Sequence, residues 1–303
     1  MKLTEKSDEE LIKEAISVKS AFERELSRHG HGFQFAVLKK ARELGRRDVT
    51  RMTLMPSLWK FSAAEFPVSI HGVGTRIDFL LFKERGGTLG TAFMVSECKK
   101  ANPAYSNWCF IRAPFSYRNM GTDHFTIDHL KISDDQKEVW SHTSAIGTIK
   151  DRAYHLGLPI KTGEKGEDQK GQPREQIEQA VTQVLRGLNG LIQTLAQHPK
   201  IVAKYDTVSF IPVIFTTANL WVSSDDLFAN LETGNLDEHL QVFERANWLW
   251  YQYNTSPGIK HSLSDRKPDE LTELLKLEYI RTVAIVSSSG IEDFLTLTSD
   301  LFI

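Results

Sequence analysis

Three charged side chains on two neighbouring predicted strands have the types and spacing of a divalent-metal site. Asp78 lies in an apolar run with the sequence RIDFLLF, and Glu97 and Lys99 lie near the end of a second run with the sequence TAFMVSECK. Side chains alternate between the two faces of a strand, so Glu97 and Lys99 share one face. If the two strands pair as a hairpin, Asp78 can lie beside Glu97 across the ladder.

Two carboxylates and one ammonium group on a shared sheet face predict phosphodiester hydrolysis with a bound cation. Mg²⁺ takes hard oxygen ligands, commonly one or two carboxylates together with waters and substrate phosphate oxygens. Such an ion lowers the pKa of a bound water, and Lys99 could orient that water or offset transition-state charge. We therefore expect Asp78 and Glu97 to hold Mg²⁺ or Mn²⁺. The alternative is a structural ion pair between Lys99 and its neighbours.

The composition of the first strand indicates a sheet that is covered on both faces. Ile77 and residues 79–82 are all apolar, whereas a strand with one solvated face would alternate. Asp78 is then costly to bury unless it is paired or bound to a metal. Cys98 points to the face opposite Glu97 and is expected in the core.

Two helices are predicted before the hairpin. Apolar residues recur at helical spacing over residues 8–28 and again over residues 33–44, and Gly45 favours a helix end there. At 100° per residue, Gln34 projects into the middle of the second apolar stripe, and Glu23 falls on or beside the first. Gln34 is therefore a polar side chain aimed toward the interior.

A basic segment spans the same helices. From Lys19 to Arg51 there are nine Lys and Arg residues against four Asp and Glu residues. One interpretation is a solvated helix face, and the other is a patch from Arg24 to Arg51 that faces phosphates. The formal net charge of −2 for the whole chain gives no global nucleic-acid signature, so any such signature is local.

The rest of the chain predicts a long helix and further strands. Residues 174–197 form a helix with one apolar stripe and a flank of glutamines and glycines, which we expect to pack against a neighbouring element. Residues 208–217 form a buried strand, in which Pro212 indicates an edge position or a bulge. Residues 281–287 predict another strand. This order indicates an α/β fold with a central mixed sheet flanked by helices, in a single domain over residues 1–303.

Composition excludes several classes of protein. The 303 residues are 41% hydrophobic and 25% charged, as in an ordinary globular protein. No apolar run reaches the 18 or so residues of a membrane span, and the charged N-terminal segment predicts no signal peptide. Only two cysteines, Cys98 and Cys109, argue against a disulfide scaffold and indicate a cytoplasmic location.

The charged residues and their spacing resemble the PD-(D/E)xK restriction-endonuclease-like nuclease superfamily. The similar segments are RID at Arg76–Asp78 and ECK at Glu97–Lys99, after an opening helix with the sequence HGFQFAVLKKARELG. The resemblance implies a core over about residues 20–220, with an insertion over residues 101–173 and a C-terminal elaboration over residues 221–303. It also implies that the helix at 174–197 packs on the sheet and is followed by a core strand.

The resemblance also assigns roles to side chains. It implies Asp78 and Glu97 as metal ligands and Lys99 as the catalytic lysine. The acidic helix position of the superfamily falls on Gln34, or on Glu23 in the preceding helix, and both remain open. If Gln34 occupies that position, a second metal ion would lack one charged ligand. The resemblance then implies a site with a single metal ion, or slower hydrolysis.

The predicted function is that of a Mg²⁺-dependent endonuclease that cleaves DNA in restriction or host defence. The expected partners are DNA and either a second copy of the chain or partner subunits of a defence system, with no membrane. One alternative is a catalytically inactive nucleic-acid- or protein-binding module on the same fold. Another is a metal-dependent hydrolase of a small nucleotide phosphodiester. Trp221, Trp248, Trp250, Tyr251 and Tyr253 could stack on bases, although aromatic residues beside apolar strands are more often part of the core.

Overall fold

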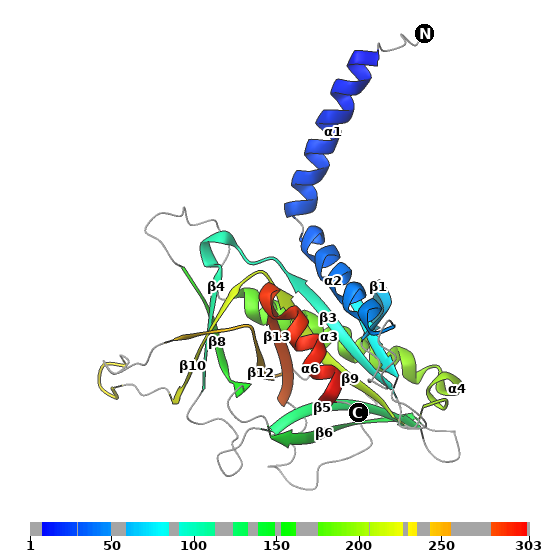
Figure 1. Ribbon diagram of the computed structural model, residues 1–303. Coiled ribbons are helices and arrows are strands. Elements are labelled where there is room, and N and C mark those ends of the chain that lie inside the picture. The colour runs from blue at the N-terminus through cyan, green and yellow to red at the C-terminus, as the bar shows by residue number, and fades with distance from the viewer. Residues whose placement is uncertain are drawn as a thin grey trace.

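The computed structural model describes residues 8–28, 30–49, 59–84, 91–112, 124–132, 139–148, 153–161, 175–205, 207–226, 230–234, 243–255 and 280–301. The turn of the predicted hairpin and Arg51 lie outside these residues. The protein is an α/β protein with a central mixed sheet flanked by helices, as the order of elements predicted (Figure 1).

Two sheets and several helices make up the described part of the chain. The central sheet contains β1 Lys60–Ile70, β2 Val73–Glu84, β3 Thr91–Lys99, β5 His124–Ile132, β6 Val139–Thr148, β7 Ala153–Tyr154, β9 Val208–Thr216, β12 Trp248–Asn254 and β13 Ile280–Ser287. The smaller sheet contains β4 Asn107–Arg112, β8 Leu156–Ile160, β10 Asn219–Asp226 and β11 Glu244–Ala246. The α-helices are α1 Asp8–Arg28, α2 His31–Val49, α3 Glu175–Ala196, the short α4 Pro199–Val202 and α6 Ile291–Leu301.

The first three strands form an antiparallel meander. Ile70 pairs with Val73, so β1 and β2 are joined by a two-residue turn. Both turn residues, His71 and Gly72, have positive φ (49° and 79°), as a type I′ hairpin turn requires. β3 then pairs antiparallel with β2 and parallel with β9, so the predicted hairpin is present and β3 is an interior strand.

One edge of β9 is shared by two strands from distant parts of the chain. β5 pairs with residues 208–210 of β9, and β13 pairs with residues 213–216. Pro212 lies between these two ladders while it pairs on its other side with Val95 of β3. The prediction that Pro212 marks an edge strand or a bulge is therefore wrong. Pro212, which has no N–H to donate, lies between the residues of β9 that pair with β5 and those that pair with β13.

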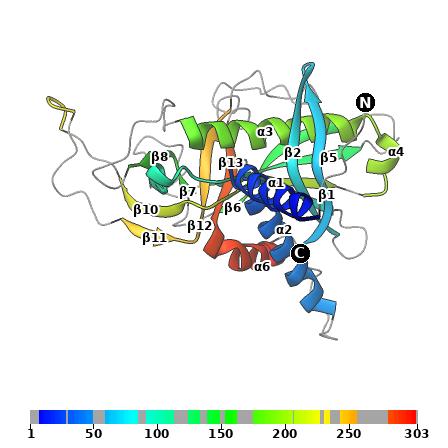
Figure 2. The ribbon, with the colours of Figure 1, turned by 90° about the horizontal axis from the view of Figure 1, so that it is seen from above.

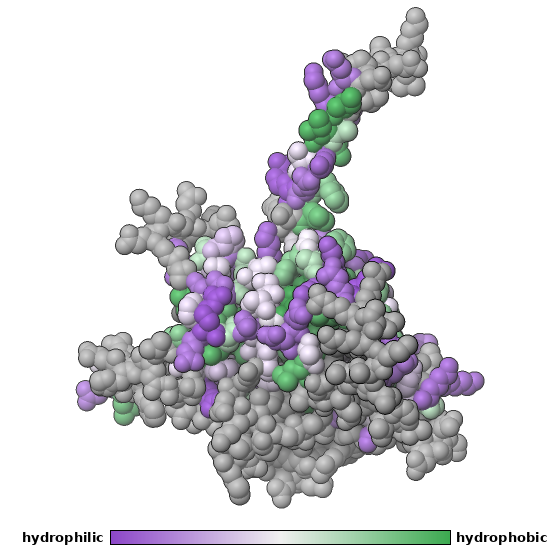
Figure 3. Space-filling model, in the orientation of Figure 1, coloured by the Kyte–Doolittle hydropathy of each residue, from purple (hydrophilic) through white to green (hydrophobic). Residues whose placement is uncertain are grey.

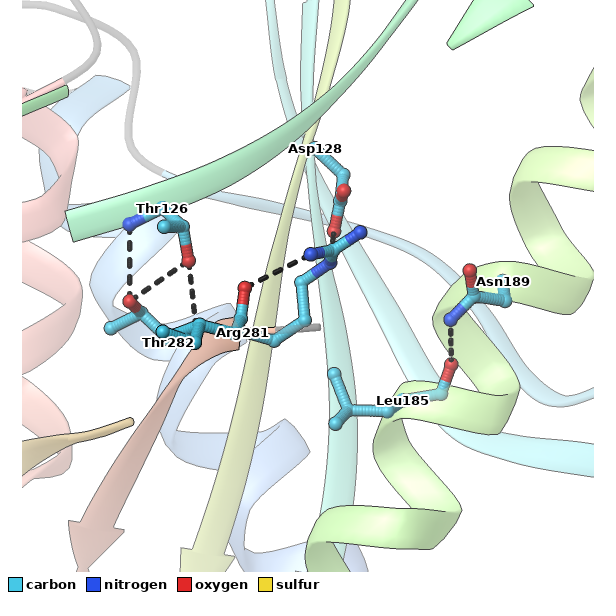
Figure 4. Close-up of polar contacts among 7 residues, drawn as sticks. Thr126, Asp128, Leu185, Asn189, Arg281 and Thr282 are labelled. Carbon is cyan, nitrogen blue, oxygen red and sulfur yellow. Dashed lines mark hydrogen bonds and ion pairs between the residues drawn. The ribbon is translucent and has the colours of Figure 1, made fainter. Parts of the chain in front are cut away.

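Buried polar side chains join β5 to β13 at this junction (Figure 4). Arg281 Nε lies 3.1 Å from Asp128 Oδ2, and both side chains are buried. Thr126 and Thr282 each donate a backbone N–H to the hydroxyl of the other, at 3.0 and 2.9 Å. These side-chain bonds join two strands that are both partners of β9, so the sheet stays continuous across the change of partner.

Helices cover both faces of the central sheet, as the apolar run of β2 predicted. Figure 2 shows α3 along one side of the strands and α2 and α6 along the other. Leu80 and Val95 pack in the cluster that contains α3 residues, whereas Phe79, Leu81 and Met94 pack in the cluster that contains α2 and α6 residues. The alternation of side chains along β2 and β3 therefore fills two separate cores.

The glycines of α3 let this helix approach the sheet closely. A Cβ at Gly187 would lie 2.9 Å from Cγ1 of Ile77, and a Cβ at Gly190 would lie 2.8 Å from Cγ2 of Val68. Both distances are shorter than ordinary carbon contacts, so only glycine fits there without movement of β1 or β2. The prediction that this flank of the helix packs against a neighbouring element is confirmed for its glycines.

The C-terminal part of the chain belongs in part to the central sheet. Residues 221–303 supply β12 and β13, and the strand predicted at 281–287 is the buried β13. Trp248, Trp250 and Tyr251 of β12 are buried, so these aromatic residues belong to the core.

Helix α1 stands away from the rest of the chain (Figure 1). The predicted helical spacing is present, but Ile12, Ile16 and Phe22 are each about 60% exposed, and Figure 3 shows apolar side chains along this helix. None of the described helices is both long and apolar enough to cross a membrane.

Candidate functional site

The register of β2 and β3 brings Asp78 and Glu97 together. Phe79 lies opposite Ser96, so the next position in the same register places Asp78 opposite Glu97. Glu97 is only 7% exposed, and Asp78 is partly buried. Two carboxylates from adjacent strands therefore meet where the ladder between β2 and β3 ends.

Burial and neighbouring carboxylates raise the pKa of both Asp78 and Glu97. Burial and the nearby Asp78 charge raise the pKa of Glu97 to about 7, against the lowering effect of Lys99. Burial also raises the pKa of Asp78, opposed by the backbone N–H of Cys98, which donates to Asp78 Oδ2 at 2.6 Å. A cation between the two groups would favour the ionised forms that burial disfavours.

Lys99 connects the carboxylates to helix α3. Its Nζ lies 3.1 Å from Glu97 Oε1 and donates to Gln183 Oε1 at 2.5 Å. The lysine side chain remains 27% exposed, so its ammonium group is accessible from solvent. Gln183 was not predicted as a site residue, although its place in the glutamine flank of this helix was the signal that could have identified it.

Gln34 lies at the site, but its amide nitrogen points toward the carboxylates. Nε2 donates to Glu65 Oε1 at 2.9 Å and to the backbone carbonyl oxygen of Asp78 at 2.8 Å. Both partners are acceptors, which fixes the orientation of the amide. The amide oxygen lies 3.3 Å from His31 Nδ1. Gln34 thus ties α2 to β1 and β2.

Glu65 is an acidic neighbour that the sequence did not reveal. Ala64 lies opposite Phe79 and Phe66 opposite Ile77, so the same register places Glu65 opposite Asp78. The charge of Glu65 contributes to the raised pKa of both Asp78 and Glu97. It lies on β1, a segment whose secondary structure the sequence left ambiguous, and no motif distinguishes it.

The structure does not bring Glu23 to this site. Glu23 is exposed on α1, where it pairs with Lys19 at 3.8 Å. Of the two side chains considered for the helix position, only Gln34 contacts β1 and β2.

The basic segment is only partly described. Lys39 and Arg42 are exposed on α2, whereas Lys40 pairs with Glu292 of α6 at 2.5 Å. Arg51 lies outside the described residues, as do the side chains of Arg46 and Arg47.

Cys98 faces away from the carboxylates. It packs against the core cluster of α2 and α6, as strand alternation predicted. Burial and the nearby charges of Asp78 and Glu97 raise the pKa of the Cys98 thiol well above its ordinary value. A neutral thiol is a core side chain and a poor nucleophile.

The donor chemistry fits a hard divalent cation. Within the described residues, no group of three or more His, Cys, Asp and Glu side chains is arranged so that it could hold a metal ion. Mg²⁺ sites commonly use only one or two carboxylates and complete their shell with waters and substrate oxygens. Asp78 and Glu97 supply the two carboxylates that such a site needs. The two cysteines, Cys98 and Cys109, form no disulfide and are not among the proposed ligands.

Comparisons with protein-family models, with curated proteins and with solved structures find no match to this chain.

Proposed function

We propose that this protein is a Mg²⁺-dependent endonuclease with a restriction-endonuclease-like fold, which cleaves DNA in restriction or host defence in the cytoplasm. The single observation that carries the proposal is the meeting of Asp78 and Glu97 on adjacent strands, with Lys99 two residues further along β3. A buried and a partly buried carboxylate are costly to keep side by side when a single lysine offsets their charge. Packing alone would not require carboxylates there, since apolar side chains fill both cores.

The order of elements around the site also supports the proposal. Helix α2 precedes the β1–β2–β3 meander, α3 packs on the sheet after it, and β9 then pairs parallel with β3. This is the order that the resemblance to the PD-(D/E)xK superfamily implies.

In the proposed mechanism, Asp78 and Glu97 hold the cation and Lys99 acts on the substrate. A bound Mg²⁺ supplies a water of lowered pKa and positive charge for the phosphoryl oxygens. The Lys99 ammonium group has three N–H donors; with two engaged by Glu97 and Gln183, the third is available to a phosphate oxygen or to the attacking water. Burial and the Asp78 charge raise the pKa of Glu97 to about 7, so a bound cation would favour its ionised form near neutral pH.

Plasmid cleavage tests the proposal. Supercoiled, linear and single-stranded DNA are incubated with the protein in Mg²⁺ or in EDTA, and products are separated on gels. We expect cleavage of DNA that depends on Mg²⁺ and falls roughly 100-fold or more in Asp78→Asn protein, because a ligand charge is lost. Asp293→Asn, at an exposed position on α6, is the matched control and should cleave as wild type does.

Other outcomes of that experiment favour the two alternatives. Hydrolysis of a small phosphodiester without cleavage of any DNA would indicate the hydrolase of a small nucleotide. Binding of DNA without hydrolysis of either substrate would indicate the inactive binding module. One observation keeps this second candidate open: Lys99 Nζ lies 3.1 Å from Glu97 Oε1, so the lysine itself offsets charge on that carboxylate.

A further inference from the structure

Glu65 has a backbone conformation that its side-chain type does not favour. Its φ is +49°, within the left-handed region that costs non-glycine residues about 1 kcal/mol or more. The described residues with positive φ other than glycine are Glu65 and the turn residue His71. His71 occupies a hairpin turn that requires positive φ, whereas Glu65 lies within a long strand.

The unusual backbone coincides with the position opposite Asp78. The pairs on either side, Ala64 with Phe79 and Phe66 with Ile77, are both formed, and the ladder skips Glu65 and Asp78, as it also skips Ser62 at the register shift between Phe61 and Ala63. The backbone carbonyl of Asp78 instead accepts from Gln34 Nε2, which also donates to Glu65 Oε1. A buried amide from α2 therefore replaces the missing ladder contact and orients the carboxylate of Glu65.

The Glu65 carboxylate lies at an exposed position of β1, where solvent reaches it. Among the described residues neither Glu65 nor Asp78 forms an ion pair, and the nearby Lys99 is engaged with Glu97 and Gln183. Gln34 contacts only Oε1 of Glu65, so Oε2 accepts no hydrogen bond from the described residues. Carboxylates from β1, β2 and β3 thus influence one another electrostatically, with the Lys99 ammonium group and the His31 ring as the basic groups beside them.

We propose that Glu65 is a positioning residue for the cation held by Asp78 and Glu97, with Gln34 holding its carboxylate in place. The inference rests on the proposed function. Glu65 would add the negative charge that the neutral Gln34 cannot supply, and its second oxygen would be available to accept a hydrogen bond from a water of a bound cation. Outer carboxylates of this kind typically change metal affinity by 10- to 100-fold.

The experiment measures the midpoint of thermal unfolding during a Mg²⁺ titration of the full chain. We expect Mg²⁺ to raise the Tm of wild-type protein, and Glu65→Gln to need about tenfold more Mg²⁺ for half of that rise. Glu65→Asp keeps the charge and should need less Mg²⁺ than Glu65→Gln. Glu244→Gln, at an exposed position on strand β11, is the matched control and should titrate as wild type does.

A second variant separates this role from a merely structural one. Glu65→Gly removes the side chain and relieves the left-handed backbone, so its Tm without Mg²⁺ should equal or exceed that of wild type, while its response to Mg²⁺ weakens. Equal Mg²⁺ requirements in wild type, Glu65→Gln and Glu65→Gly would overturn the role of Glu65 and leave the metal site standing. If wild-type protein shows no response to Mg²⁺, the proposed function itself fails.

Discussion

Glu97 is a buried carboxyl group at which a proton and a cation compete. Burial and Asp78 raise its pKa from 4.5 to about 7, so between these pH values the folded protein binds more protons than the unfolded chain. In the absence of a cation, the contribution of Glu97 to the free energy of unfolding is therefore largest below about pH 4.5, and it falls as the pH rises to 7. A shift of this size corresponds to roughly 3 kcal/mol.

Replacement of Glu97 by glutamine should stabilise the protein only in the absence of Mg²⁺. At pH 8 without cation we expect Glu97→Gln to raise the free energy of unfolding, because the buried charge is gone. With saturating Mg²⁺ the advantage should disappear, since only wild-type protein gains from the cation. Urea unfolding at pH 5 and pH 8, with and without Mg²⁺, measures both effects. A Glu97→Gln protein that is less stable than wild type at pH 8 without cation would show instead that the ion pair with Lys99 dominates.

Part of the site could be predicted from single residues and part could not. Asp78, Glu97 and Lys99 follow from strand alternation and one hairpin, because both are local properties of the sequence. Glu65 and Gln183 come from a third strand and a distant helix. Their positions depend on the register of β1 and on the close approach of α3, which no short segment encodes.

At the scale of elements, α3 determines where β2 lies. Gly187 contacts Ile77, the residue next to Asp78, so the helix surface supports the strand that carries a carboxylate. The glutamine flank of the same helix reaches Lys99 through Gln183. One face of α3 therefore positions both strands of the site.

Gly187→Ala should destabilise the protein and disturb the site. The added Cβ would lie 2.9 Å from Ile77 Cγ1, and overpacking of this kind typically costs about 1–3 kcal/mol. Gly32→Ala in α2 is the control, because its Cβ would have no atom within 4 Å, and alanine favours helix. Urea unfolding should show a loss for Gly187→Ala alone. Equal free energies of unfolding for the two variants would mean that α3 can move away from β2 without loss of stability, which would contradict this prediction.

The elements themselves were more predictable than their pairing. Helical spacing identified α1, α2 and α3, and apolar runs identified β2, β3, β9 and β13. The error at Pro212 arose because a proline within a strand usually marks an edge. The sequence could not show that β5 and β13, more than 140 residues apart, share one edge of β9. Such pairing depends on the whole chain.

At the scale of the whole molecule, the site lies close to the junction of α1 and α2. A Cβ at Gly30 would lie 3.7 Å from Cβ of Lys100, which directly follows β3. The junction turns at Gly30, whose φ of +78° favours glycine. The exposed basic residues Lys39 and Arg42 belong to the helix that begins there. In the proposed function, this arrangement places positive charge on a helix that also reaches the carboxylates through Gln34.

Lys99 and Lys100 provide a matched pair for the most direct test of the central claim. They are adjacent in sequence and carry the same charge, but only Lys99 contacts Glu97 and Gln183, whereas Lys100 is exposed. The measurement is the rate of Mg²⁺-dependent nicking of supercoiled plasmid by wild-type, Lys99→Met and Lys100→Met proteins, each shown to be folded by circular dichroism. We predict a loss of roughly 100-fold or more in Lys99→Met and less than tenfold in Lys100→Met. Nicking by Lys99→Met at the wild-type rate, or its absence in wild-type protein, would contradict the assignment of a nuclease site.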